Sequence, residues 1–535
     1  MSNKTKTGSP VVRSLIHSAG IMGFLTAVSR VLGFVRDGMI AVFYGTSVTA
    51  QAFVVAFRIP NLLRDLVGEG AANTAFVPVF SRVRTLEGEE SWAKLAQAVW
   101  MRVLAGTLVI SVLGVIAAPW LVRLIAPGFY SDSELVRQTT LLTRILFPFI
   151  GLVAVTAFLM GLLNSLHEFA LPSLGPSVLN LCMIAGLFAW RPNALGLAVG
   201  ILVGGFLQIL IQLPFLRKSG LRLNFRWEPH PGLKQIGRMM IPRVVGSGVY
   251  QISVLVDNIF ASFSSLVGSG GIAALYFATR FLHLPLALFG ISVAQAALPT
   301  LSAHAATNEI EPFKKTVFMA LRSSLFIAFP SAIGLMAMGR PIIQTLLEHG
   351  HFTGHSTDQT VSALTWYATG LAAMCASKVL INAFYAFHDT WTPVKSAAIA
   401  LVLNIIFNAA LIFPMGLGGL ALATSLSGTW NAAHLYGLMK RRLNGVPAGF
   451  ERVVVKMLAA SAAMGIVSRL CWEAGIGRIP SHPAAAVGLL AVTLMIGVSV
   501  FFGLALLLKI EEAGQLLRWI YERISGSEKT PAPAG

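Results

Sequence analysis

Long apolar runs recur along the whole chain, and they constrain its fold more than any other feature. Examples are residues 103–119, 141–163, 401–414 and 484–508. The longer runs match the roughly 20 residues that an α-helix needs to cross a bilayer. Apolar residues make up 55% of the chain and charged residues 12%, whereas soluble domains carry about 25% charged residues. These features exclude a soluble fold and predict an all-α polytopic membrane protein with about 14 transmembrane helices.

Hydropathy and loop charge together predict the spans and their orientation. We expect spans at 18–45, 50–82, 97–125, 137–165, 172–190, 194–216, 236–264, 271–303, 316–347, 359–387, 394–413, 417–439, 452–472 and 484–508. Lys and Arg gather in alternate loops, for example at 82–94, 217–238 and 440–456, whereas 45–50, 128–134, 264–271 and 349–358 are poor in them. Because basic loops stay in the cytoplasm, both termini are expected there, with tails at 1–17 and 510–535.

The net charge of +18 would indicate nucleic acid in a soluble protein, but here the surplus lies in short loops between spans. One basic segment, 217–235, is too polar to cross a membrane, although Leu221, Leu223, Phe225 and Trp227 alternate with polar residues in it. We expect an amphipathic linker on the cytoplasmic membrane surface. It separates two halves of the chain.

A faint internal repeat relates these halves. The segment 76–81 resembles 297–302, and His167-Glu168 before Pro172 resembles His388-Asp389 before Pro393, each at an offset of 221 residues. The repeat predicts two six-helix lobes, at 18–216 and 236–440, which is the plan of an alternating-access transporter. Two additional helices fall within 441–509.

Charged residues inside several predicted spans require an explanation, because a charge at mid-bilayer costs roughly 2.5 to 3.5 kcal/mol. The cations are Arg30, Arg36, Arg58, Arg64, Arg280 and Lys378, and the nearby acids are Asp37, Asp65 and Glu69. One explanation is structural ion pairing. The acids are too few to neutralise every cation, and a positive surplus favours a phosphate or diphosphate ligand, which guanidinium groups bind in bidentate fashion.

The phrases around these charges resemble the MurJ (MviN) family of lipid II flippases, in the multidrug/oligosaccharidyl-lipid/polysaccharide exporter superfamily. The resemblance lies at 29–37, 57–64, 69–71, 75–78, 126–129 and 392–395. It implies two six-helix lobes around a central cavity, and two C-terminal helices that form a groove for a polyprenyl tail. It also implies location in the bacterial inner membrane and export of lipid II, a diphosphate-linked disaccharide-pentapeptide on a lipid tail. Membrane lipids and, as a candidate class, cell-wall synthesis proteins are the other expected partners.

Candidate site residues follow from these charges and from the resemblance. The resemblance implies that Arg30, Arg36, Arg64 and Arg280 line the cavity, and we add Arg58 and Asn61 as candidate substrate ligands. Asp37, Glu69 and Lys378 are candidates for gating ion pairs. The chain departs from the family at three positions. Many relatives have Asp in place of Gln51, a basic residue in place of Asp65 and Asp in place of Thr279. Gating pairs that use those positions in relatives are therefore not expected here.

A second polar set suggests a coupling cation. Asp257 is the lone acid in its span, Asn404 and Asn408 lie four residues apart on one helix face, and Thr424 comes from the next span. Their oxygens suit a hard cation, and the resemblance indicates Na⁺. A polar cluster that joins helices is the alternative. There is no Walker motif for ATP, and the three cysteines have no metal or disulfide spacing.

Two other transporters compete with a lipid II flippase. A flippase for another undecaprenyl-linked glycan would need the same diphosphate site. A cation-coupled drug exporter would need acids rather than arginines in the N-terminal lobe. No nucleophile or acid-pair constellation supports an enzyme, so we predict none.

Overall fold

The computed structural model describes residues 10–63, 75–166, 168–190, 193–221, 223–478 and 483–524. Throughout these residues the regular elements are helices. They divide into two compact units, and each is described by itself. Unit 1 contains residues 1–265, 269–273 and 350–352, and unit 2 contains 266–268, 274–349 and 353–535.

Unit 1 is a bundle of long helices. Its elements are α1 (Pro10–Tyr44), α2 (Val48–Leu63), α3 (Val77–Ile125), η3 (Pro127–Ser131), α4 (Ser133–Leu146), α5 (Phe149–Ser165), α6 (Ala170–Ala189), α7 (Leu195–Lys218) and α8 (Gly232–Ala261). Aromatic side chains form the centre of its apolar core, including Phe76 directly before α3, Phe80 of α3 and Phe158 of α5. The backbone of α3 is broken at Gly88, whose φ of 86° favours glycine.

Small residues let α6 and α7 pack closely. A Cβ on Gly186 would lie 2.1 Å from the Gly196 carbonyl oxygen, and one on Gly200 would lie 2.5 Å from that of Cys182. Since Gly196, Gly200 and Gly204 are spaced by four residues, they form a stripe along one face of α7. Stripes of this kind hold membrane helices together by close backbone contact.

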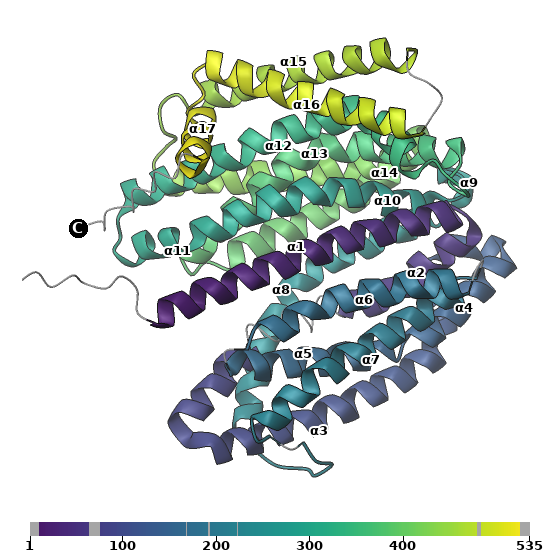
Figure 1. Ribbon diagram of the computed structural model, residues 1–535, viewed down its shortest axis with the longest axis vertical. Coiled ribbons are helices and arrows are strands. Elements are labelled where there is room, and N and C mark those ends of the chain that lie inside the picture. The colour runs from purple at the N-terminus through teal and green to yellow at the C-terminus, as the bar shows by residue number, and fades with distance from the viewer. Residues whose placement is uncertain are drawn as a thin grey trace, which may run out of the picture. The chain divides into compact units, whose positions relative to one another are not determined.

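Unit 2 contains the remaining helices. They are α10 (Gly271–Pro285), which begins in unit 1, then η4 (Leu286–Ile291), α11 (Ser292–Ala306), α12 (Ile310–Leu347), α13 (Gly354–Ala386), α14 (Trp391–Arg442), α15 (Phe450–Ile476), α16 (Pro483–Leu507) and α17 (Glu511–Ile524), and the short α9 (Ser264–Val267) lies at the boundary. Figure 1 shows α15 and α16 side by side along α12, and apolar residues of all three share the core of this unit.

Most predicted spans fall within described helices, whereas the span predicted at 50–82 includes residues 64–74, which lie outside the described residues, and the number of spans stays a prediction. Among the described residues, ten helical stretches are long and apolar enough to cross a membrane, and two shorter apolar ones lie at Val48–Leu62 and Gln251–Ala261. The continuous α14 covers two predicted spans, and its backbone breaks between them at Gly416 (φ 52°, ψ −126°). Contacts group α8 with unit 1, and the predicted lobe boundaries likewise stay predictions.

The repeat found in the sequence has a counterpart in the backbone. After α5 the Glu168 amide donates to the Leu163 carbonyl at 2.9 Å, and after α13 the Asp389 amide donates to the Phe384 carbonyl at 3.0 Å. The two donors, Glu168 and Asp389, are 221 residues apart in the sequence, and so are the two acceptors, Leu163 and Phe384. Each bond closes the six-residue turn of a Schellman helix end. The two halves therefore end corresponding helices in the same way.

Candidate substrate site

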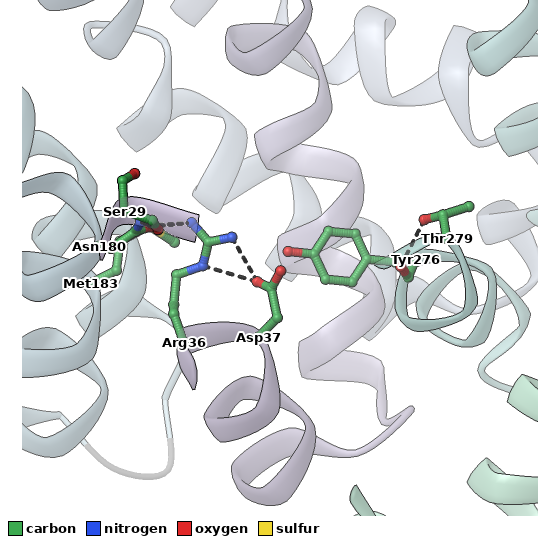
Figure 2. Close-up of polar contacts among 7 residues, drawn as sticks. All are labelled: Ser29, Arg36, Asp37, Asn180, Met183, Tyr276 and Thr279. Atoms are coloured by element: carbon green, nitrogen blue, oxygen red, sulfur yellow. Dashed lines mark hydrogen bonds and ion pairs between the residues drawn. The ribbon is translucent and has the colours of Figure 1, made fainter. Parts of the chain in front are cut away.

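A compact polar cluster joins α1 to α6 inside unit 1 (Figure 2). The Arg36 guanidinium binds Asp37 Oδ1 through Nε at 2.9 Å and through Nη2 at 2.7 Å. Its Nη1 donates to Asn180 Oδ1 at 2.7 Å and lies 3.7 Å from the Met183 sulfur. The Asn180 amide in turn donates to the Ser29 carbonyl at 3.0 Å. Arg36 is thus held in one orientation by both helices.

Helical spacing explains why α1 can build this cluster. Ser29, Gly33 and Arg36 share one face of the helix, and Gly33 leaves room beside the Asn180 amide. The side chains of Arg36 and Asp37 are only 12% and 7% exposed. An arginine buried to this degree requires its partners, because an isolated buried charge is strongly unfavourable.

Arg30 has a different environment on the same helix. It is exposed, and within the described part of the chain it forms no hydrogen bond or ion pair. It lies 14 residues before the end of α1 at Tyr44, or about 21 Å along the axis. It shares a helix face with Asp37, seven residues away. A permanently charged group at this depth is stable only where it faces water or an anion.

The predicted residues of α2 are described in part. Arg58 Nη2 donates to Asn258 Oδ1 of α8 at 3.4 Å, and the Asn258 side chain is buried. Asn61 is half-buried and follows Pro60, which lacks the amide hydrogen for a helical bond. Arg64 and Glu69 lie outside the described residues.

Unit 2 contributes two further cations from predicted spans. The Arg280 guanidinium lies over the Tyr276 ring on α10, 4.2 Å from its centroid. This cation–π contact places the face of the guanidinium against the ring. Lys378 is half-buried on α13, one turn after Cys375, and no ion pair to it occurs among the described residues.

The polar groups suggested for a cation fall in two places. Asn404 and Asn408 are buried on α14, where Asn408 Nδ2 donates to Asn404 Oδ1 at 3.2 Å and Asn404 Nδ2 lies 3.4 Å from Thr424 Oγ1. Asp257 is on α8 of unit 1. No group of three or more His, Cys, Asp or Glu is arranged for a metal within the described residues. The unit 2 cluster offers neutral oxygens, which suit a weakly held alkali cation better than a transition metal.

Three contributors were not predicted from the sequence. Asn180, Asn258 and Tyr276 each contact a predicted arginine but stand in ordinary apolar runs. The sequence could have indicated Asn180 and Asn258 as buried hydrogen-bonding residues, because a lone amide inside a membrane span is costly without a partner. The partner itself could not be read from the sequence, since the bond between Asn180 and Arg36 joins residues 144 positions apart.

Known proteins resemble this chain over most of its length. Residues 40–494 match the family model described as lipid II flippase MurJ. A relative from Haemophilus influenzae, named probable lipid II flippase MurJ, is 35% identical over 82% of this chain and 89% of its own length. The lipid II flippase MurJ of Burkholderia cenocepacia is 32% identical over 90% of this chain and 95% of its own.

Solved structures extend the comparison to the fold. A lipid II flippase MurJ in an inward closed conformation superposes with a TM-score of 0.76 and 26% identity, covering 90% of this chain and 97% of that one. An inward-facing multidrug transporter of the MATE family, in the MOP superfamily, gives a TM-score of 0.66 at 16% identity, covering 78% of this chain and 94% of that one. The second likeness concerns the fold alone.

Proposed function

The chain belongs to the MurJ family of lipid II flippases, and on this basis we propose that it moves lipid II across the bacterial inner membrane. The polar head, a disaccharide-pentapeptide on a diphosphate, travels from the cytoplasmic to the periplasmic leaflet while the lipid tail stays in hydrocarbon. Both termini are proposed to lie in the cytoplasm. We assign the protein transport and no enzymatic step.

The exposed guanidinium of Arg30 supports this function most directly. It lies within an apolar helix, about 21 Å from the helix end, and carries no protein counter-ion within the described residues. Guanidinium matches phosphate oxygens in geometry and charge. A diphosphate that enters from the cytoplasm would supply the charge that Arg30 lacks.

The other cations would act differently from Arg30. Arg36 is already held by Asp37 and Asn180, so a diphosphate would have to compete with the Asp37 carboxylate for it. Arg280 lies over the Tyr276 ring of its own helix. We propose that substrate passes among these groups by alternating access, in which the cavity opens to one side of the membrane at a time.

Sodium is the proposed coupling ion. The support is a set of neutral oxygens at the buried Asn404 and Asn408 and the half-buried Thr424. The sequence of this chain contains no Walker motif for ATP. Asp257 is the predicted acidic ligand. If Asp257→Ala abolishes the sodium dependence of lipid II transport, Asp257 takes part in sodium binding. If the sodium dependence is unchanged, Asp257 is not a sodium ligand.

The function is tested by replacing the native flippase of a bacterium with this chain and measuring lipid II that reaches the outer leaflet. The intact chain should restore lipid II arrival and growth, and Arg30→Ala and Arg280→Ala should fail at equal abundance in the membrane. Arg137→Ala is the matched control, because Arg137 pairs with Glu134 on an exposed helix turn. Inserted wild-type protein that gives no rescue would contradict lipid II as substrate and favour another undecaprenyl-linked glycan.

A further inference from the structure

The linker between α7 and α8 is fixed to α3 by a set of hydrogen bonds. The buried Gln97 amide of α3 donates to the carbonyls of Asn224 and of Arg226, the latter at 2.9 Å, and its oxygen accepts from the Asn224 amide at 2.8 Å. The amide group of Gln97 thus satisfies backbone donors and acceptors on both sides of Phe225. One side chain therefore fixes the backbone of three consecutive linker residues.

A second attachment holds the end of the linker. The His230 ring is nearly buried, with Nε2 3.0 Å from Ser91 Oγ and Nδ1 accepting from the Gly232 amide at 3.1 Å. Ser91 donates to the Glu87 carboxylate at 2.5 Å. At the beginning of the linker, Leu221 is buried in the core of unit 1. The segment is thus anchored at its beginning, middle and end.

Although the backbone is held in this way, the most apolar side chains of the linker point outward. Phe225 and Trp227 are 81% and 61% exposed. Burying large apolar side chains stabilises a fold, and here the fixed backbone keeps both away from the core. The two side chains are two residues apart and both are exposed, so both rings can enter one apolar layer.

The height of Trp227 relative to the membrane follows from its contact with α3. The Arg102 guanidinium lies over the Trp227 ring at 5.3 Å and donates to the Glu228 carbonyl at 3.0 Å. The apolar run of α3 begins at Val103, so one edge of the hydrocarbon lies close to this residue. Arg102 directly precedes the run. Trp227 therefore lies at the level of the lipid headgroups, where tryptophan is enriched.

The positive charge around Phe225 and Trp227 favours anionic lipid. Residues 217–238 contain six Lys or Arg and one Glu. Of these cations, Arg217, Lys218, Arg226, Lys234 and Arg238 are exposed. Basic residues near an anionic bilayer are attracted to it, and salt weakens the attraction.

We propose that the linker is a rigid binding surface for anionic phospholipid, with Phe225 and Trp227 inserted among the headgroups and the surrounding cations on lipid phosphates. Membrane helices alone would hold the protein in any bilayer. The linker adds a preference for anionic lipid on the side that the positive-inside rule assigns to the cytoplasm. This inference does not depend on which substrate is exported.

Fluorescence of the reconstituted full chain tests the proposal. A variant with Cys182, Cys375 and Cys471 replaced by Ser receives Phe225→Cys and an environment-sensitive fluorophore, and is placed in vesicles of phosphatidylcholine with or without phosphatidylglycerol. We expect a blue shift and protection from aqueous iodide only with phosphatidylglycerol, both reduced by high salt and by an added Arg226→Gln. A label at Glu90→Cys, which is exposed on α3, should respond to neither lipid.

Two outcomes would overturn the proposal. Equal protection in pure phosphatidylcholine would show insertion without recognition of anionic lipid. Full iodide access in every vesicle would show that the rings stay in water, and would assign the pair to a protein partner instead. Neither readout uses transport, so failure here is separate from failure of the flippase assignment.

Discussion

The two units share the geometry of a helix end but differ in the polar groups they bury. The turn after α5 in unit 1 and the turn after α13 in unit 2 close with equivalent hydrogen bonds 221 residues apart. Inside the helices, unit 1 buries an ion pair, Arg36 with Asp37, whereas unit 2 buries two neutral amides, Asn404 and Asn408. The repeat is thus retained where the chain turns, and the polar interior has diverged. The proposed diphosphate contact at Arg30 belongs to unit 1, and the proposed sodium ligands Asn404 and Asn408 belong to unit 2.

The largest expected effect comes from removing the acid of the buried pair. Asp37→Leu leaves the Arg36 guanidinium without its carboxylate, which we expect to cost about 3 to 5 kcal/mol of folding stability. Thermal unfolding of the purified protein in detergent measures the loss. The double variant Arg36→Met with Asp37→Leu should recover most of it. If the double variant is no more stable than the single one, the pair is not coupled as described.

Breaking the link between α1 and α6 should have the next largest effect. Asn180→Leu removes the bonds to Arg36 and to the Ser29 carbonyl, and a bond to a charged group contributes roughly 1.5 to 3 kcal/mol. Asn180→Asp keeps an oxygen for Arg36 and should retain more stability. Thermal unfolding in detergent measures the stability of both variants. An equal loss of stability in Asn180→Leu and Asn180→Asp would show that Arg36 does not depend on this contact.

The shared turn offers a matched pair of smaller changes. Asp389 accepts from the Thr392 amide at 3.0 Å and from the Thr392 hydroxyl at 2.9 Å, and Arg442 binds it at 3.2 Å, whereas the equivalent Glu168 side chain makes no such bond within the described residues. Asp389→Ala should cost about 1 kcal/mol, as for other helix caps, and Glu168→Ala almost nothing. Thermal unfolding measures both losses, and an equal loss of stability in Asp389→Ala and Glu168→Ala would contradict the predicted difference between the two turns.

The Asp389 contribution should also depend on pH. Partial burial raises the pKa of the Asp389 carboxyl, but the Thr392 hydrogen bonds and the Arg442 guanidinium outweigh burial and hold the pKa below its ordinary value. A lowered pKa means that the stabilisation is complete above the unfolded value of about 3.9 and is lost as pH falls through the folded value. The stability gap between wild type and Asp389→Ala should therefore narrow in acid. A gap that is constant across this range would contradict the assignment.

The neutral cluster should give the smallest change in stability. Asn408→Leu removes one bond between amides, and such bonds in membrane proteins average about 0.6 kcal/mol. If the cluster binds sodium, the thermal midpoint of the intact chain should be higher in sodium than in potassium at equal ionic strength, and Asn408→Leu should abolish that difference. A sodium effect that survives the substitution would exclude the cluster as the site.

Sequence reasoning reached the fold because hydropathy and charge are local properties. The runs that predicted spans at 172–190 and 194–216 correspond to α6 and α7, and the linker at 217–235 separates α7 from α8. Close packing of α6 on α7 could not be predicted in detail from the sequence, because it depends on which faces of the two helices meet at Gly186 and Gly200.

The candidate site was accessible from sequence only as a set of charges. Arg30 and Arg36 were indistinguishable there, because each is an arginine in an apolar run, and only their surroundings separate an exposed cation from a paired one. Arg36 depends on Asn180, whose position beside α1 results from tertiary packing. The sequence therefore indicates that charges occur in the membrane, and the structure indicates which of them already has a partner.

Transport of lipid II by the purified protein tests the central claim most directly. The intact chain is reconstituted into vesicles containing lipid II, and the rate at which its head group appears in the opposite leaflet is measured with an impermeant enzyme or label. We predict protein-dependent transfer that is lost in Arg30→Ala and retained in Arg137→Ala. Transfer by Arg30→Ala at the rate of the intact chain would contradict diphosphate recognition by the exposed arginine of α1.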